Sequence, residues 1–249
     1  MEDEMQIIKS AEQASSCSES RNAIESNGDG DAQSVLISAD CTEIFVVRHG
    51  RTDWNVERRI QGHLDVGLNE DGRQQARAVA DRLSKEGKIS AIYSSDLERA
   101  IETSKLIATV CGGVEVIKDP DLREQNPGKV QGLVESEATH VYPQIHEAYR
   151  SGRWDQEVPG GESKEQVYQR CTACLRSIGL KHKGERVVVV THGTVFRCLY
   201  RMARPNETQF GPKVNNGSIS ILHLFGGDDW VIKSWGDLSH LNQIDDKLY

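Results

Sequence analysis

Two histidines stand in the same local setting, directly behind an apolar run and directly before a glycine. His49 lies in "VVRHG" and His192 lies in "VVVVTHG". A neutral imidazole that faces a phosphoryl group can act as a covalent catalyst. The charge of Arg48 favours the neutral form of its neighbour, and its guanidinium fork matches phosphate oxygens in bidentate fashion. The two segments together predict a pocket for a phosphoryl group rather than two histidines that only pack.

The segments around these residues alternate between strand-like and helix-like patterns. This alternation predicts an α/β fold, a doubly wound, mostly parallel sheet with helices on both faces. Ligands of such sheets gather at the carboxyl ends of the strands, so residues 48–50, 94–95 and 191–193 are expected to converge on one site. Strands are expected at 42–48, 89–95, 113–119 and 185–191, helices at 69–87, 96–113 and 163–184, and a hairpin at 217–237.

Local signals refine this outline. Ser95 and Asp96 are candidate N-caps of the second helix, and Ser163 opens the third with Gln166 at capping-box spacing. The segment 125–161 is rich in Gly and Pro and is the least regular part of the expected domain. We therefore predict an insertion beside the site there, a candidate lid.

The chain has 249 residues and a formal net charge of −8, nearly all of it carried by the first 40 residues. That segment is rich in Ser, Glu, Asp and Gly without an aromatic residue, a composition typical of disorder. We expect a disordered acidic tail at 1–40 and a single catalytic domain at 41–249. No apolar stretch reaches the roughly 20 residues of a membrane helix, so no membrane contact is expected. The start "MEDEMQ" is unlike a secretory or transit signal, which predicts a cytoplasmic location.

Other features exclude further classes of function. The six cysteines are scattered, and Cys171 with Cys174 lies inside a helical pattern, so packing roles are expected rather than disulfides or a zinc site. Basic residues form no stripe beyond the histidine motif, so no nucleic-acid partner is expected. A homo-oligomer stays possible.

Six segments carry a resemblance to a known family. They are "RHGRTDWN", "QGHLDVGLNEDGRQQA", "YSSDLERAIETS", "LREQNPGKVQG", "PGGES" and "VVVVTHG". Their order and approximate spacing resemble the histidine phosphatase superfamily, in its phosphoglycerate mutase-like branch. The resemblance covers roughly residues 42–225, essentially the whole expected domain.

The resemblance implies a role for each matching residue. His49 would be the nucleophile that forms a phosphohistidine. Arg48, Arg99 and His192 would bind the phosphoryl oxygens, and this charge stabilisation would replace a metal, so neither metal nor cofactor is expected. Glu124, in "LRE", would donate a proton to the leaving alcohol and then act as base on water. Further phosphate or substrate contacts would come from Asn55, Gln61, Gly62 and Gly193.

Three functions stay open. The favoured one is a metal-independent phosphomonoesterase that hydrolyses a small phosphorylated metabolite through a phosphohistidine. Phosphoglycerate mutase-type transfer is an alternative, but it calls for extra cations in the lid, and residues 125–161 carry three bases against five acids. A non-catalytic phosphate-binding protein is the other, disfavoured because every core group is present. Asn126 and Pro127 depart from the family pattern, so the backbone that aims Glu124 could differ here.

Overall fold

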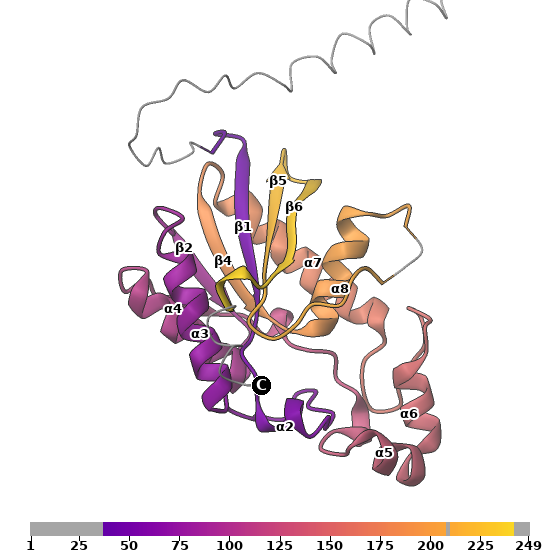
Figure 1. Ribbon diagram of the computed structural model, residues 1–249. Helices are drawn as coiled ribbons and strands as arrows, with labels where there is room; N and C mark the ends of the chain where they lie inside the picture. The colour runs from indigo at the N-terminus through magenta and orange to yellow at the C-terminus, as the bar shows by residue number, and fades with distance from the viewer. Residues whose placement is uncertain (1–36, 208–209, 242–249) are drawn as a thin grey trace, which may run out of the picture. The chain divides into compact units, whose positions relative to one another are not determined.

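The computed structural model describes residues 37–207 and 210–241, so nearly all of the tail expected at 1–40 lies outside the described residues. The centre is a six-stranded sheet in the order β3-β2-β4-β1-β5-β6 (Figure 1). Strands β1 to β4 run parallel, and β5 and β6 form an antiparallel hairpin. The expected mostly parallel sheet is confirmed. Its strands are β1 (Cys41–Arg48), β2 (Ala91–Ser94), β3 (Val116–Lys118), β4 (Arg186–Thr191), β5 (Ile219–Phe225) and β6 (Asp229–Asp237).

Long helices cover both faces of this sheet (Figure 1). Helices α3 (Glu70–Leu83) and α4 (Glu98–Val110) pack together on one face, and α7 (Lys164–Lys181) and α8 (Gly193–Ala203) on the other. Helix α7 begins with the expected capping box of Ser163 and Gln166. Short 3-10 turns lie at η2 (Pro120–Leu122) and η4 (Ser239–Leu241).

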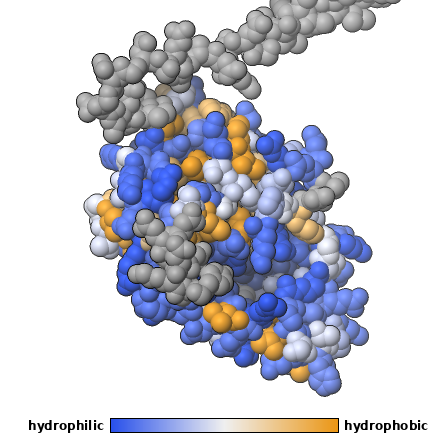
Figure 2. Space-filling view, viewed as in Figure 1, coloured by the Kyte–Doolittle hydropathy of each residue, from blue (hydrophilic) through white to orange (hydrophobic). Residues whose placement is uncertain are grey.

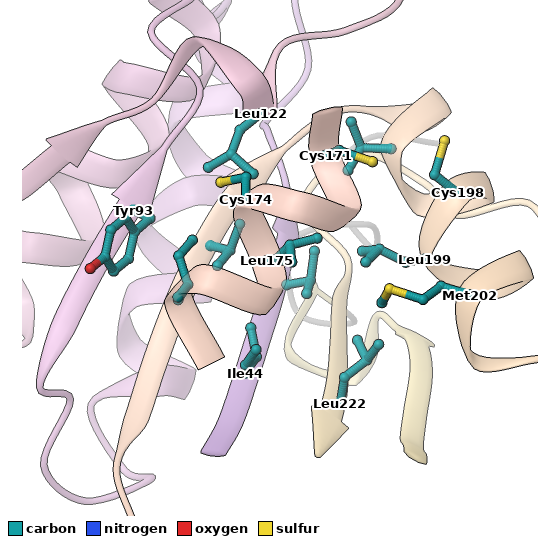
Figure 3. Packing of buried hydrophobic residues seen from close by; sticks show 14 of the residues in the cluster. Ile44, Tyr93, Leu122, Cys171, Cys174, Leu175, Cys198, Leu199, Met202 and Leu222 are labelled. Carbon is teal, nitrogen blue, oxygen red and sulfur yellow. The ribbon is translucent and has the colours of Figure 1, made fainter. Parts of the chain in front are cut away.

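The valine run of β4 serves two hydrophobic cores at once. Val187 and Val189 belong to the core under α7 and α8, part of which is seen in Figure 3. Val188 and Val190 belong to the core under α3 and α4. A strand buried on both faces needs apolar side chains in both directions, which is why β4 reads as an unbroken run.

The register of the sheet places the two histidines side by side. Arg48, the last residue of β1, pairs with Thr191, the last residue of β4. His49 and His192 therefore leave adjacent strands at the same level, and the N–H of His49 donates to the carbonyl of Thr191 at 3.0 Å. Strand β2 pairs with β4 up to Ser94 and Val190, which brings Ser95 to the same edge. The three segments expected to converge do so.

The turn after His49 packs closely against the start of α3. A Cβ atom on Gly50 would lie 2.4 Å from the carbonyl oxygen of Gly72, and one on Gly72 would lie 2.0 Å from that of Arg51. Both positions therefore require glycine. The side chain of Arg51 lies 3.5 Å from Asp71 across the same contact. The backbone that carries His49 is thus held on a fixed support.

The segment 125–161 is more regular than expected. It contains η3 (Gly128–Val130), α5 (Glu135–Val141) and α6 (Pro143–Arg150), and the short α2 (Asp53–Val56) lies near them beyond the strand ends (Figure 1). Helices of seven and eight residues are too short for a clear helical period, and a proline in the first turn does not prevent a helix. They pack through a small core around Ile60, Val130 and Ala138.

Helix α4 lacks the N-cap expected from Ser95 or Asp96. Its N-cap residue is Leu97, which makes no side-chain cap bond. The hydroxyl of Ser95 lies 2.7 Å from a ring nitrogen of His192, and the carboxylate of Asp96 accepts two bonds from Arg123 at 2.6 and 2.5 Å. Both polar side chains serve long-range contacts, so the local cap prediction is wrong.

The face of the molecule in Figure 2 is mostly hydrophilic, with hydrophobic side chains in small groups. No helix within residues 37–207 and 210–241 is long and apolar enough to cross a membrane. Five cysteines lie in this part of the chain, and all are free thiols. Cys171 and Cys174 are buried inside α7, as expected for cysteines that pack.

Candidate active site

His49 lies directly after β1 with only 3% of its surface exposed. Its Nδ1 atom is 2.7 Å from the carbonyl oxygen of Gly50. Because a carbonyl only accepts, Nδ1 carries the hydrogen and donates it, which leaves the lone pair on Nε2. Nε2 is therefore the nucleophilic nitrogen of this ring.

The environment holds His49 in its neutral form. Its pKa lies well below 6.5, first because the ring is buried, then because of the charges of Arg99 and Arg48. From the sequence, Arg48 alone was expected to lower this pKa, but burial is the larger cause, and the charge of Arg99 in α4 has a larger effect than that of Arg48. The neutral ring is the form that can attack phosphorus.

His192 faces His49 across the strand ends. The ring centroids lie 5.0 Å apart with an interplanar angle of 54°. His192 is fully buried, and its pKa is also well below 6.5, first through burial and then through the charge of Arg99. Its Nε2 atom lies 2.7 Å from the hydroxyl of Ser95, whereas its Nδ1 has no partner in the described part of the chain.

Both arginines are anchored by backbone carbonyls. Arg99 is 1% exposed and donates from Nη2 to Gly62 at 2.8 Å and from Nη1 to Leu64 at 3.1 Å. Arg48 donates from Nη1 to Val214 at 2.6 Å. Burial lowers the pKa of Arg99 to about 10, so the side chain still carries its charge at neutral pH.

Several buried polar atoms of the expected site residues lack a partner among the described residues. They include the Nε atoms of Arg48 and Arg99 and the Nδ1 atom of His192, together with Oε1 of Gln61. A buried donor left unpaired costs roughly 1–3 kcal/mol. Phosphoryl oxygens would offer acceptors to the three nitrogens, so these residues suit a bound phosphoryl group.

The carboxylate of Glu124 lies at the start of α8. Its Oε1 accepts from the N–H of Gln125 at 2.8 Å and from that of Thr194 at 3.2 Å. A Cβ atom placed on Gly193 would lie 3.7 Å both from Oε2 of Glu124 and from Cζ of Arg48. The acid candidate and a phosphate-binding candidate thus flank Gly193, whose bare backbone leaves space between them.

Asn55 is held within the site by its own oxygen. Oδ1 accepts from the N–H and hydroxyl of Thr52, both at 3.1 Å, and from Asn216 at 3.3 Å. Asn216 also donates to the carbonyl of His49 at 3.0 Å. Because Oδ1 is occupied, the Nδ2 group of Asn55 is the part left to contact a ligand.

Gly62 contributes its backbone. Its φ is +55°, and a Cβ atom there would lie 2.3 Å from the ring of Pro127. Its carbonyl accepts from Arg99, so the glycine supports that arginine. Gln61 beside it is buried.

A cavity of about 440 Å³ opens beside Arg48 and Glu124. Glu124 is the one acidic side chain among the described residues that line it. The cationic lining side chains besides Arg48 are Arg150, Lys164, Arg197 and Lys213. Three of these four lie outside residues 125–161, so the net charge of that segment gave a wrong picture of the pocket, which is strongly basic.

These cations repel one another. Lys164 is 5% exposed, and its ammonium group donates to the carbonyls of Tyr149 at 3.1 Å and Ser151 at 2.6 Å. Burial, then Arg197 and Arg150, lower its pKa to about 8. Burial and Arg197 lower the pKa of Arg150 too. A bound anion would relieve this repulsion.

Residues 37–207 and 210–241 contain no group of three or more His, Cys, Asp or Glu side chains placed to hold a metal ion. The charges that lower the pKa values of His49 and His192 include those of Arg99 and Arg48, which repel a cation. The donor set at this site therefore suits an anion.

The profile of the histidine phosphatase superfamily (branch 1) matches residues 44–238. The chain belongs to the histidine phosphatase superfamily. The match covers nearly all of the described residues and contains each residue placed at the site above. The resemblance inferred from the six sequence segments is therefore confirmed for this histidine phosphatase.

Relatives agree with this assignment. The chain is 56% identical to phosphoglycerate mutase-like protein 4 of Arabidopsis thaliana over 205 residues, which are 82% of this chain and 89% of that protein. It is 44% identical to the metal-independent phosphoserine phosphatase of Arabidopsis thaliana over 214 residues, 86% of this chain and 89% of that protein. The solved structure of Bacillus stearothermophilus YhfR has a TM-score of 0.75 at 31% identity and covers 81% of this chain and 100% of that one. The expected phosphomonoesterase of the phosphoglycerate mutase-like branch is confirmed.

Sequence reasoning missed several residues of the site. Ser95 was expected near the site but its side chain was read as a helix cap, and Asn216 was not identified as a site residue. The basic residues Lys164, Arg197 and Lys213 lie in three separate segments outside the quoted motifs, and each alone looks like an ordinary surface charge. Asn216 lies in the turn just before β5, at the same edge of the sheet as the two histidine motifs. This position is the signal that could have identified it.

Proposed function

We propose that this histidine phosphatase works through a phosphohistidine on His49. In the first step the Nε2 lone pair attacks phosphorus, the bond from phosphorus to the ester oxygen breaks, and Glu124 gives its proton to the departing alcohol. In the second step Glu124 takes a proton from water, the water oxygen attacks phosphorus, and the P–N bond breaks. Inorganic phosphate leaves and both side chains return to their starting forms. The bond from Nδ1 of His49 to Gly50, which frees Nε2, carries this proposal.

Three neighbours would stabilise the transferring group. Arg48, Arg99 and His192 each have a buried nitrogen without a protein partner at this site. Their donors would bind the phosphoryl oxygens, on which charge increases in the transition state. This arrangement needs no metal ion.

We further propose that the substrate carries a second anionic group, such as a carboxylate, beside its phosphate. Support comes from the basic side chains of the pocket beside Arg48. The ammonium group of Lys164 donates two of its three N–H groups to carbonyls, so one N–H is left for a ligand. The names of the two Arabidopsis relatives, which refer to phosphoserine and phosphoglycerate, agree with such a substrate.

Mutase-type transfer is the second candidate function, and the basic pocket favours it more than the sequence did. The deciding experiment assays hydrolysis of O-phosphoserine and 3-phosphoglycerate beside phosphoglycerate mutase activity. We expect release of inorganic phosphate to exceed isomer exchange. Faster exchange than hydrolysis would make transfer the function, while absence of both would remove the proposed substrate class.

The remaining sequence predictions stay proposals. We propose a single catalytic domain at 41–249 preceded by an acidic tail, and a cytoplasmic location. Removal of residues 1–36 should leave activity unchanged, because each site residue lies after position 47. A fluorescent fusion of the full chain would test the location.

A further inference from the structure

Arg170, a residue of α7 outside the phosphoryl site, makes an unusual number of contacts with the backbone that precedes and includes Glu124. Its Nη1 donates to the carbonyls of Asp121 and Arg123, both at 2.8 Å. Its Nη2 donates to the carbonyl of Glu124 itself at 3.0 Å. One side chain thus binds three carbonyls within four consecutive residues.

The remaining donors of Arg170 bind Glu162. Nε lies 2.8 Å from Oε1 and Nη2 lies 3.0 Å from Oε2. A guanidinium has five N–H groups, and all five are used here. The pair is partly buried, with 16% of the Arg170 side chain and 21% of the Glu162 side chain exposed.

Glu162 binds the residues that directly follow Glu124 in the chain. Its Oε2 accepts from the N–H of Asn126 at 2.9 Å, and its own N–H donates to the carbonyl of Asn126 at 2.8 Å. Its carbonyl accepts from the side chain of Gln125 at 2.8 Å. The backbone is therefore fixed on both sides of Glu124, including the Asn126 that departs from the family pattern.

From these contacts we infer that the Arg170–Glu162 pair is a positioning unit for Glu124, which it aims at the leaving oxygen of the substrate. His63 adds a third support, since its Nε2 donates to the carbonyl of Glu124 at 2.7 Å. Neither Arg170 nor Glu162 lines the pocket, so the unit acts through Glu124 and not on substrate. The inference rests on the proposed role of Glu124 as proton donor.

Two substrates that differ in their leaving group distinguish a loss of Glu124 positioning from a general loss of protein stability. p-Nitrophenyl phosphate has a good leaving group that needs little protonation, whereas phenyl phosphate has a poorer one, and the two esters otherwise match. kcat/KM reports only the steps up to release of the alcohol, where the acid acts. Variants of the full chain to compare are Glu124→Gln, Arg170→Lys, Glu162→Gln and the double variant of Arg170→Lys with Glu124→Gln.

Glu124→Gln should lower kcat/KM for phenyl phosphate roughly 100-fold or more and lower kcat/KM for p-nitrophenyl phosphate much less. Arg170→Lys keeps the charge but loses the five-donor fork, and a misplacement of about 1 Å can cost up to roughly 100-fold. We expect a loss about tenfold larger for phenyl phosphate than for the nitrophenyl ester. Glu162→Gln should also lower kcat/KM more for phenyl phosphate than for the nitrophenyl ester, by a smaller factor. It replaces Arg170→Lys in the test if that variant folds poorly.

The double variant is the sharper measurement, because effects that act through one group do not add. In the Glu124→Gln background, Arg170→Lys should change kcat/KM less than about threefold. Arg176→Lys is the matched control: Arg176 lies on the same helix, and its Nε binds Asp228 at 2.7 Å at the surface. Arg176→Lys should leave kcat/KM for both esters unchanged.

Equal losses for both esters in Arg170→Lys and Glu162→Gln, or losses that multiply in the double variant, would overturn the inference and leave the pair a structural role only. A different result would contradict the proposed function itself. If Glu124→Gln itself affects both esters equally, Glu124 is not the proton donor.

Discussion

The Nε2 atom of His192 lies 2.7 Å from the hydroxyl oxygen of Ser95. The same oxygen lies 3.4 Å from the N–H of Leu97, which can only donate. A hydroxyl can accept from Leu97 and still donate its own hydrogen to Nε2. In that arrangement the hydrogen of the neutral imidazole sits on Nδ1, the tautomer that can donate to a phosphoryl oxygen, and we propose that Ser95 favours it.

Ser95→Ala should therefore lower kcat/KM for p-nitrophenyl phosphate by up to about tenfold, the size of one hydrogen bond. The ring would keep its place but lose the partner that fixes its tautomer. Ser104→Ala is the control, because Ser104 is a buried serine of α4 that bonds only the carbonyl of Ile101. Equal activity of the Ser95→Ala variant and the wild type would remove Ser95 from the account.

The basic pocket predicts a preference for substrates with a second negative charge. 3-Phosphoglycerate and glycerol 3-phosphate differ in whether the far end of the molecule is a carboxylate or a hydroxymethyl group. The enzyme should bind the first more tightly, and Arg197→Met should reduce that difference by roughly ten- to 100-fold, since hydrogen bonds to charged groups contribute about 1.5–3 kcal/mol. Inhibition constants against p-nitrophenyl phosphate measure this even for a ligand that is not turned over.

Arg201→Met provides the control for that experiment. Arg201 lies one turn further along α8 and pairs with Glu165 instead of lining the pocket. Its loss should change both inhibition constants equally. If the wild type binds the two ligands with equal affinity, the pocket does not recognise a second anion.

Lys164 gives this pocket a pH dependence. Its pKa is lowered to about 8, so its ammonium group is charged below that pH and neutral above it. The inhibition constant of 3-phosphoglycerate should therefore rise between pH 7 and pH 9, while that of glycerol 3-phosphate should follow this transition only weakly. Lys164→Met should remove the difference between the two profiles. Persistence of the transition in Lys164→Met would assign it to another group.

Chelation should leave activity intact. Arginines and His192 stabilise the phosphoryl charge in the proposed reaction, and residues 37–207 and 210–241 contain no cluster of His, Cys, Asp or Glu placed to hold a metal ion. Hydrolysis of p-nitrophenyl phosphate should be the same before and after dialysis against EDTA. Loss of activity that magnesium restores would contradict the proposed reaction.

The convergence of His49 and His192 could be predicted from sequence because it depends on strand ends alone. In a parallel sheet, residues that follow adjacent strands must meet at one edge. Arg99 was equally predictable, since it lies in the first turn of the helix that follows β2. Local pattern sufficed for each of these residues.

The aim of Glu124 and the basic character of the pocket could not be predicted in this way. Glu124 is placed by Arg170 and Glu162, which lie elsewhere along the chain, and no local spacing reveals five bonds of one guanidinium. Lys164, Arg197 and Lys213 meet only in the folded chain, so a count of charge over one segment missed them. Ser95 shows the same limit, because its short-range cap signal lost to a long-range partner.

The most direct test of the proposed reaction is to trap the phosphoenzyme and locate its phosphate. Glu124→Gln should be phosphorylated by p-nitrophenyl phosphate but lack the base for the second step, so the intermediate accumulates. After an alkaline quench, peptide mass spectrometry and separation of the two phosphohistidine isomers should find phosphate on Nε2 of His49, because Nδ1 is bonded to Gly50. Phosphate on another residue, or wild-type turnover by His49→Ala, would show that His49 is not the nucleophile.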